Sequence, residues 1–217
     1  MERGIPGAGE SSELKVVRVP VSKHRRGVRQ RLALFVAVVG VLLLLYVSSQ
    51  YWQMYAAQRR LALEWQQQNA RPASISTSDN GVLVRLMIAK INLDAVVVEG
   101  TSHQSLKLGP GHLEGSAVPG KSGNSVIVAH RDTFFRHLDE LQDGDEIDLR
   151  RQGEVYRFEV VGRRVVAPTE VSALRPSSST QLTLITCYPT HYVGPAPNRL
   201  VVVARLMASS DISRKNQ

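Results

Sequence analysis

Apolar and polar positions divide this chain into two regions with different patterns. Residues 32–47 (LALFVAVVGVLLLLYV) carry no charge, and with the positions up to Trp52 the run reaches about 20 residues, roughly the length that crosses a bilayer as a helix. After Gly81, short β-branched runs alternate with Gly, Pro, Asp and Asn, which is typical of strands joined by turns. The pattern therefore predicts one membrane helix followed by a β-domain.

The apolar run is interpreted as an uncleaved signal anchor over residues 32–52. Tyr51, Trp52 and Tyr55 lie where an interfacial belt of aromatic residues is expected. A cleaved signal peptide is the first alternative, but the tail before the run is long, at about 30 residues, and no small-x-small cleavage site follows Val47. A buried core helix is the second alternative, and it would need polar residues on one face, which the run lacks.

The charge distribution gives the anchor an orientation. The chain has 27 Lys and Arg against 19 Asp and Glu, a formal net charge of +8. Residues 1–31 hold eight basic and three acidic residues, and basic flanks stay in the cytoplasm. The predicted topology is a single pass through the cytoplasmic membrane, with the N-terminus inside and the β-domain outside. The rest of the chain is only mildly basic, which disfavours a nucleic-acid-binding domain.

Five segments are expected along the chain. They are a basic cytoplasmic tail (1–31), the anchor (32–52), a helical stalk and linker (53–80), a β-domain (81–207) and a disordered C-terminal tail (208–217). Good helix formers in Gln53–Ala70 are expected to continue the membrane helix as a stalk. Arg71–Asn80 has the composition of a linker.

The β-domain is predicted to be all-β, with eight strands that close into a barrel or stack as a sandwich. The candidate strands are Leu83–Ile88, Ala95–Glu99, Ser125–Ala129, Glu146–Arg150, Val155–Val161, Arg164–Ala167, Leu182–Thr186 and Leu200–Leu206. One short helix is expected over Thr133–Leu141, with Asp132 as its N-cap. Closure into a barrel would also remove exposed strand edges.

The single cysteine, Cys187, is the first candidate for chemistry. One cysteine excludes an intramolecular disulfide and a zinc site built from several cysteines. A buried structural thiol is the alternative, because free cysteine is among the most buried residue types. A nucleophilic thiol needs a neighbouring cation that stabilises the thiolate. His130 ends the apolar run VIVA and Arg199 opens the run LVVVARL, so three predicted strand ends carry Cys, His and Arg.

The other histidines are ranked below His130. Four of them lie in the tail, in polar or glycine-rich loops or on the predicted helix: His24, His103, His112 and His137. His191 is the serious rival, because it follows Cys187 by four residues. Asp132 is interpreted as the helix cap rather than as a residue that orients the His130 imidazole.

At these residues the sequence resembles the sortase family, the cysteine transpeptidases of bacterial cell surfaces. The family's cysteine motif Thr-Leu-x-Thr-Cys matches Thr183–Cys187, its histidine strand matches Val126–Arg131, and its arginine matches Arg199. The segments LGPGHLEGSAVPGKSGNSVIVAHRDTFFRHLDEL and CYPTHYVGPAPNRLVV extend the resemblance over residues 82–206, and the second is most similar to class D sortases. Where many relatives carry a bulky aromatic after Cys-Tyr-Pro, this chain has Thr190.

The resemblance implies an eight-stranded sortase-type barrel and transpeptidation at a Leu-Pro-x-Thr-Gly-like sorting signal. Cys187 would attack the Thr carbonyl and form a thioacyl intermediate, His130 would act as acid and base, and Arg199 would stabilise the oxyanion or hold the substrate. Thr186 would help to position the substrate, or would be a structural strand residue. The implied partners are proteins with a C-terminal sorting signal and an amine acceptor, such as a wall precursor or a pilin-type lysine.

Two other functions stay open. A thiol peptidase would pass the thioacyl group to water, and an inert surface module would use the groove only to bind peptides. No cofactor or metal is expected. Some sortases use calcium, but here the acidic run is interpreted as a turn and a solvated strand face; it consists of Asp143, Asp145, Glu146 and Asp148.

Overall fold

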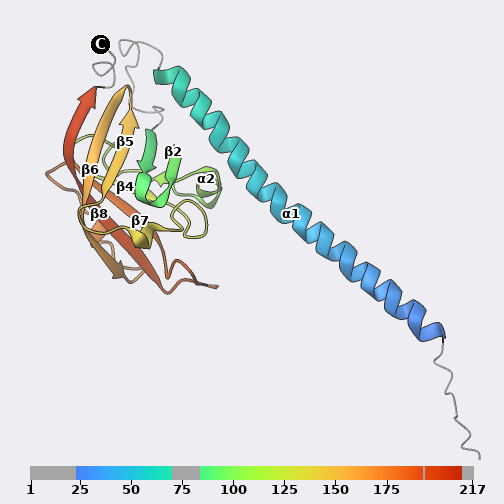
Figure 1. The fold of residues 1–217 in the computed structure, drawn as a ribbon. Helices are drawn as coiled ribbons and strands as arrows, with labels where there is room; N and C mark the ends of the chain where they lie inside the picture. Colours follow the sequence, from blue (N-terminus) through green and yellow to red (C-terminus); the bar gives the residue numbers. More distant parts are fainter. Residues whose placement is uncertain (1–22, 70–83, 193, 212–217) are drawn as a thin grey trace, which may run out of the picture. The chain divides into compact units, whose positions relative to one another are not determined.

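The computed structural model describes residues 23–69, 84–192 and 194–211 (Figure 1). The predicted linker over residues 71–80 and most of the N-terminal tail lie outside the described residues, as do residues 212–217. The chain divides into two compact units, residues 1–48 and residues 49–217.

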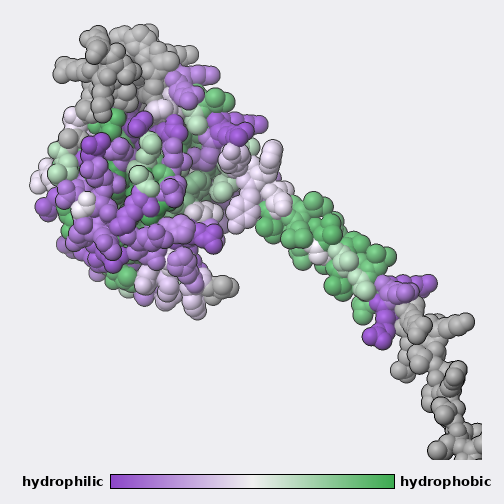
Figure 2. Space-filling view, viewed as in Figure 1, coloured by the Kyte–Doolittle hydropathy of each residue, from purple (hydrophilic) through white to green (hydrophobic). Residues whose placement is uncertain are grey.

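The helix α1 (Lys23–Asn69) contains the apolar run. Its large apolar side chains between Leu32 and Val47 are exposed, and Figure 2 shows them as an apolar surface along the helix. Within the described part of the chain, α1 is the one helix long and apolar enough to cross a membrane. The helix supports a single-pass membrane anchor. It continues without a break to Asn69, so the residues expected to form a stalk are helical.

Eight strands close into a barrel in the order β1-β2-β3-β4-β7-β8-β6-β5. Their bounds are β1 (Val84–Ile88), β2 (Leu93–Glu99), β3 (Gly111–His112), β4 (Asn124–Val128), β5 (Glu146–Arg151), β6 (Glu154–Val166), β7 (Gln181–Tyr188) and β8 (Asn198–Asp211). The β2–β3 and β4–β7 pairs are parallel and the other pairs are antiparallel. The predicted eight-stranded barrel is confirmed.

The predicted list of strands contained two errors, which offset each other and leave the number of strands unchanged. The expected strands at Val155–Val161 and Arg164–Ala167 are one strand, β6, which continues through Gly162 with a register shift between Val160 and Gly162. The two-residue strand β3 was missed, because it is too short to show any periodicity. It forms through parallel pairing with β2 and antiparallel pairing with β4.

The helix expected over Thr133–Leu141 was also wrong. Turns occupy residues 131–137, and a short 3₁₀ helix, η3, covers Leu138–Glu140. Phe135, Leu138 and Leu141 are fully buried. A spacing of three residues gives one apolar face on an α-helix as well as on 3₁₀ turns, so the sequence pattern could not distinguish the two. Two further 3₁₀ turns are η2 (Ala89–Ile91) and η4 (Ser172–Leu174), and a short α-helix that was not predicted, α2, covers His103–Leu108.

Alternating side chains fill the barrel. Leu86 and Ile88 on β1 and Ile147 and Leu149 on β5 are fully buried, with the intervening residues partly exposed. This period of two is expected for strands with one face toward a core. The buried interior makes the barrel a rigid support for side chains at its strand ends.

The C-terminal half of α1 packs on the barrel within the unit of residues 49–217. The Gln58 side-chain amide pairs with both backbone groups of Val96 on β2: its Nε2 donates to the carbonyl oxygen at 3.1 Å, and its Oε1 accepts from the N–H at 2.9 Å. Trp65 is buried, with 9% of its surface exposed, and the Arg85 guanidinium lies 5.2 Å from its ring centre. Backbone hydrogen bonding and aromatic packing therefore fix this segment to the barrel.

Candidate active site

The strand register brings the three predicted catalytic residues to one region of the barrel. Cys187 on β7 and Arg199 on β8 are directly paired residues. β4 runs parallel to β7, with Val128 opposite Ile185, so His130 and Cys187 each lie two residues beyond that pair. Cys187 is thus placed on the strand between those that lead to His130 and Arg199, and all three side chains are partly exposed.

Thr186 is buried, and its Oγ1 donates to the carbonyl oxygen of Ala129 at 2.8 Å. The Ala129 N–H donates in turn to the carbonyl oxygen of Ile185 at 3.2 Å. These two bonds hold the segment that carries His130 against the segment that carries Cys187. The Thr186 hydroxyl therefore bonds to the backbone of the neighbouring segment.

The imidazole of His130 lies next to a second histidine. Its ring centre is 5.8 Å from that of His103, which begins α2, with the ring planes at 72°. Among the described residues neither ring nitrogen of His130 has a hydrogen-bond partner, and the exposed Asp132 does not bond to it. The sequence analysis ranked His103 low as a loop residue and did not predict this proximity, because α2, on which His103 lies, was not predicted.

Arg199 is held at the start of β8 by its own loop. Its Nη1 donates to the carbonyl oxygen of Asn198 at 2.9 Å and lies 3.5 Å from that of Ala196. Its Nε and Nη2 groups have no partner within the part of the chain that the structure covers. These N–H groups belong to a planar cation and are available to an anionic group near Cys187.

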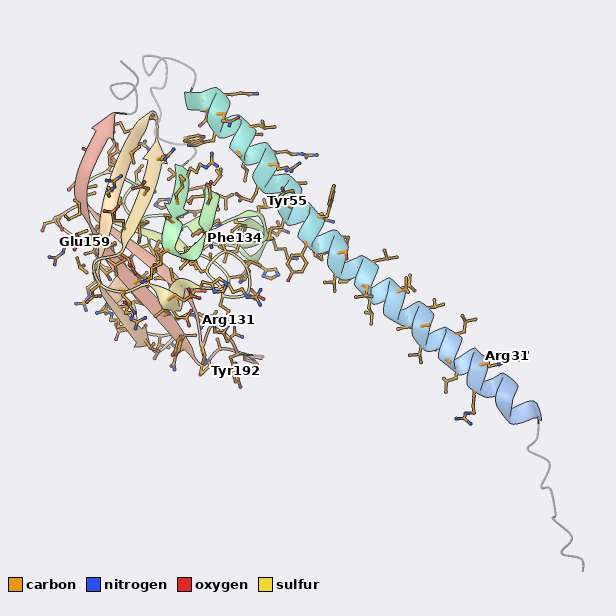
Figure 3. All side chains as sticks on the ribbon, viewed as in Figure 1. Arg31, Tyr55, Arg131, Phe134, Glu159 and Tyr192 are labelled. Atoms are coloured by element: carbon orange, nitrogen blue, oxygen red, sulfur yellow. The ribbon has the colours of Figure 1, made fainter. Side chains whose placement is uncertain are left out.

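The loop between β7 and β8 is fastened to the segment that follows His130. Arg131 donates from Nη1 to the carbonyl oxygen of Pro189 at 2.8 Å, and its guanidinium lies 5.7 Å from the ring centre of Tyr192 (Figure 3). Thr190, the residue that departs from the family pattern, is buried and donates to Asp139 Oδ2 at 2.8 Å. The small hydroxyl residue at this position therefore makes a buried polar contact between the β7–β8 loop and η3.

The rival histidine, His191, is exposed on this loop and lies near His137 rather than His130, with ring centres 6.2 Å apart. We therefore expect His191→Ala to change kcat/KM for a cleaved peptide very little. His130→Ala should lower it by about 10³-fold, the size typical of lost acid–base catalysis. A complete loss in His191→Ala, with His130→Ala tolerated, would exchange the two roles.

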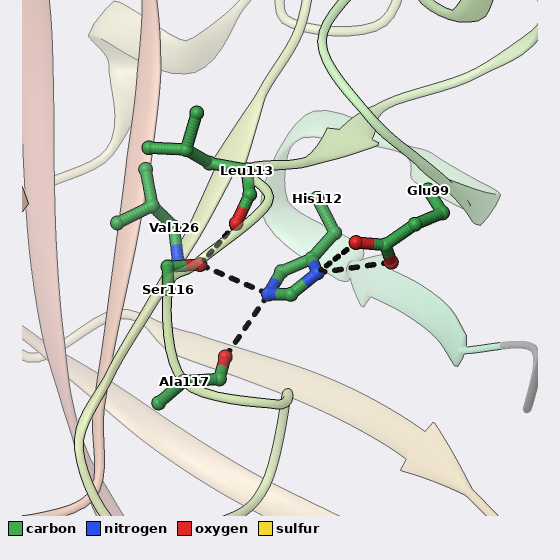
Figure 4. Close-up of polar contacts among 6 residues, drawn as sticks. All are labelled: Glu99, His112, Leu113, Ser116, Ala117 and Val126. Atoms are coloured by element: carbon green, nitrogen blue, oxygen red, sulfur yellow. Dashed lines mark hydrogen bonds and ion pairs between the residues drawn. The ribbon is translucent and has the colours of Figure 1, made fainter. Parts of the chain in front are cut away.

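A second polar cluster is centred on His112 (Figure 4). His112 is buried, and its Nδ1 is 3.0 Å from both carboxylate oxygens of Glu99. Its Nε2 is 2.9 Å from Ser116 Oγ and 3.0 Å from the carbonyl oxygen of Ala117. Sequence reasoning ranked His112 low and did not detect this acid–histidine–serine arrangement.

The hydroxyl of Ser116 is not free to act as a nucleophile. It donates to the carbonyl oxygen of Leu113 at 2.7 Å and accepts from the N–H of Val126 at 3.1 Å. His112 on β3 therefore joins the end of β2 to the turn before β4. The cluster is a structural connection, because every polar atom in it serves the backbone or a neighbour.

Loss of this connection is expected to lower stability. His112→Ala should reduce the free energy of unfolding by about 2 kcal/mol, because buried polar groups lose their partners. Urea unfolding of the full chain in detergent, followed by tryptophan fluorescence, measures the change. His137→Ala, at an exposed histidine, is the control. A loss of kcat/KM in folded His112→Ala protein, without loss of stability, would instead indicate a role in the chemistry.

The acidic run expected to form a turn and a strand face is held by basic residues. Asp145 Oδ2 is 2.7 Å from Lys90 Nζ and accepts from the N–H of Gln142 at 2.6 Å. Burial pushes the pKa of Asp145 upward, but these hydrogen bonds outweigh it and leave the pKa below its usual value. Asp148 and Glu146, on β5, lie 3.2 and 3.4 Å from Arg157.

Comparison with known proteins agrees with this geometry. The chain is 36% identical over 121 residues to Sortase D of Bacillus subtilis (strain 168), a match that covers 55% of this chain and 61% of that protein. It is 26% identical over 122 residues to Sortase A of Bacillus anthracis, covering 54% and 58%. The matches thus span about three-fifths of the length of these curated relatives.

Solved structures show the same fold. A Clostridium perfringens Sortase D5 transpeptidase aligns with a TM-score of 0.63 at 24% identity, covering 70% of this chain and 99% of that one. Sortase C-1 from Actinomyces oris aligns with a TM-score of 0.54 at 32% identity, covering 58% and 73%. The family model for the sortase domain matches residues 86–207. From the barrel and this match over more than half of its length, the chain belongs to the sortase family.

Proposed function

We propose that this protein is a membrane-anchored cysteine transpeptidase that joins a protein with a Leu-Pro-x-Thr-Gly-like sorting signal to an amine at the cell surface. The observation that carries the proposal is the register of β4, β7 and β8, which places Cys187 between His130 and Arg199. A thiol, an imidazole and a guanidinium supply a nucleophile, a proton carrier and a fixed cation. These are the groups that acyl transfer through a thioester requires.

The first step forms the thioacyl enzyme. The Cys187 thiolate attacks the carbonyl carbon of the substrate threonine, and the negative charge moves to the carbonyl oxygen. When this oxyanion collapses, the carbon–nitrogen bond breaks and His130 donates a proton to the departing glycine amine. The acyl group stays on Cys187 as a thioester.

The second step releases the product. An acceptor amine attacks the thioester, His130 takes the proton from that amine, and the Cys187 thiolate is regenerated. Arg199 stabilises the oxyanion in both steps. Its Nε and Nη2 groups can donate to the oxyanion from a cation that is already held in place, whereas water would first have to reorient. Thr186 contributes by holding the His130 and Cys187 segments together through Ala129.

The apolar helix α1 supports the location that we propose. The proposed topology keeps residues 1–31 in the cytoplasm, crosses the membrane over residues 32–52 and has the barrel domain outside, with residues 53–80 as stalk and linker. The basic residues before Leu32 support this orientation. Substrate and acceptor would then meet the site on the outer surface of the membrane. The C-terminal tail expected over residues 208–217 is wrong for residues 208–211, because β8 continues to Asp211 and pairs there with β6.

A peptide assay tests the proposal. The full chain in detergent is incubated with a labelled Leu-Pro-Ala-Thr-Gly peptide, with and without triglycine, and the products are analysed by mass spectrometry. Transfer of the acyl group to triglycine is the expected result. Release of only the free acid in both reactions would favour the thiol peptidase, and binding without any cleavage or thiol labelling would favour the inert peptide-binding module.

A further inference from the structure

A cavity of about 450 Å³ opens on one flank of His130, within the unit of residues 49–217. Its walls come from three segments: residues 50–54 of α1, residues 103–108 in α2, and residues 130–133. Tyr51 and Met54 on α1 and Leu106 on α2 give it apolar surface. Neither Cys187 nor Arg199 lines the cavity.

The α1 wall is fastened in place. Gln58, one turn after Met54, bonds to Val96 on β2 and also donates from Nε2 to the carbonyl oxygen of Leu108 at 2.6 Å. The next residue along, Gly109, leaves room for this contact, since a Cβ there would lie 2.5 Å from Gln58 Nε2 and 2.7 Å from the Val96 carbonyl oxygen. One side chain thus ties α1 to the end of α2 and to the barrel. (Figure 3 labels Tyr55, the residue after Met54.)

We propose that this cavity holds the peptide segment on the amine side of the scissile bond, so that the helix leaving the membrane forms part of the substrate site. This inference rests on the proposed transpeptidase function. In that reaction the acyl part of the substrate is bonded to Cys187, while the amine part takes its proton from His130. The two parts therefore separate across His130, and the amine part lies on the flank away from Cys187.

The chemistry of the walls fits a short peptide. Apolar side chains of Tyr51, Met54 and Leu106 can bury small aliphatic side chains, while the neighbouring glutamines, Gln50, Gln53 and Gln104, can hydrogen-bond to peptide groups. Gln50 and Tyr51 lie in the last turn of the predicted membrane span, and Gln53 and Met54 are the first residues after Trp52 on the same wall. The occupant is accordingly a polypeptide that continues for several residues beyond the glycine of the scissile bond.

Two peptides test the assignment with the full chain in detergent. The short peptide ends at the glycine of Leu-Pro-Ala-Thr-Gly, and the long peptide continues with Gly-Leu-Ala-Leu. We expect kcat/KM to be about tenfold higher for the long peptide, a modest effect for burial of one or two aliphatic side chains. The double variant Tyr51→Ala with Met54→Ala should bring the long-to-short ratio close to one. Leu63→Ala is the matched control, since Leu63 is exposed on the same helix, and it should keep the wild-type ratio.

A second measurement does not depend on turnover. The Cys187→Ala variant is irradiated with a long peptide that carries a photoreactive residue two positions after the scissile-bond glycine, and the cross-linked residues are identified by mass spectrometry. Cross-links to residues 50–54 or 103–108 are expected. Cross-links confined to other regions, or their absence, would overturn the inference.

The two failures are distinguishable. If wild-type protein cleaves neither peptide but the cross-links map to residues 50–54, the cavity binds the segment and the proposed reaction is wrong. If both peptides are cleaved at equal rates and the cross-links lie elsewhere, the reaction stands and the assignment of the cavity is wrong.

Discussion

Replacing Cys187 with alanine is expected to lower kcat/KM for peptide cleavage by at least about 10⁴-fold, the scale on which loss of an enzyme nucleophile acts. Without the thiol no atom at this position can form the acyl bond, and water would have to attack the substrate directly. Mass spectrometry of the protein mixed with a peptide should therefore show the thioacyl adduct in wild type and none in Cys187→Ala.

The loss of activity is informative only if the Cys187→Ala variant still folds. Cys187 is partly exposed at the end of β7, so the loss of one sulfur atom should leave the unfolding transition close to that of wild type. Substantial turnover by folded Cys187→Ala protein would rule out the thiol mechanism and would return Cys187 to the structural role that was its alternative from sequence.

Replacing Arg199 with lysine is expected to lower kcat by about 10²-fold, comparable to the loss of one oxyanion donor. Lysine keeps the charge but loses the planar set of N–H groups. In the structure Nη1 is used by the backbone at Asn198 and Ala196, while Nε and Nη2 are available. A lysine ammonium that replaced the backbone contacts would have no second group left to meet the oxyanion.

Arg205→Lys on the same strand is the control for Arg199→Lys, because Arg205 is exposed and lies away from the Cys187 pair, opposite Gln181. It should leave kcat close to the wild-type value. Near-full activity of Arg199→Lys would show that the arginine supports the loop rather than the reaction.

The fold was predictable where sequence periodicity is local. Short β-branched runs bounded by turn residues identified β1 and β5, whose inner residues are buried, and the uncharged run identified the apolar part of α1. Gly162 was treated as a break between strands, whereas β6 absorbs it with a shift in register against β8. β3 has only two residues, and it exists because long-range pairing creates it.

In the candidate site, too, local sequence features were predictable and long-range contacts were not. The strand ends at His130, Cys187 and Arg199 could be identified from the sequence, but their proximity depends on the parallel pairing of β4 with β7, which no local pattern encodes. Thr190 was noticed only as a departure from the family pattern. Its partner, Asp139, lies 51 residues away in the chain and follows a turn that was mistaken for a helix.

The Gln58 contact has a consequence for how the chain behaves when it is cut. Helix and barrel are joined covalently through residues 70–83, but Gln58 and Trp65 also hold them together without that connection. A protease site engineered into residues 70–83 should therefore yield two fragments that stay associated and co-purify. Loss of the polypeptide link would leave an assembled two-fragment enzyme on the membrane, whereas the same cut in Gln58→Ala would release more of the barrel as a free fragment.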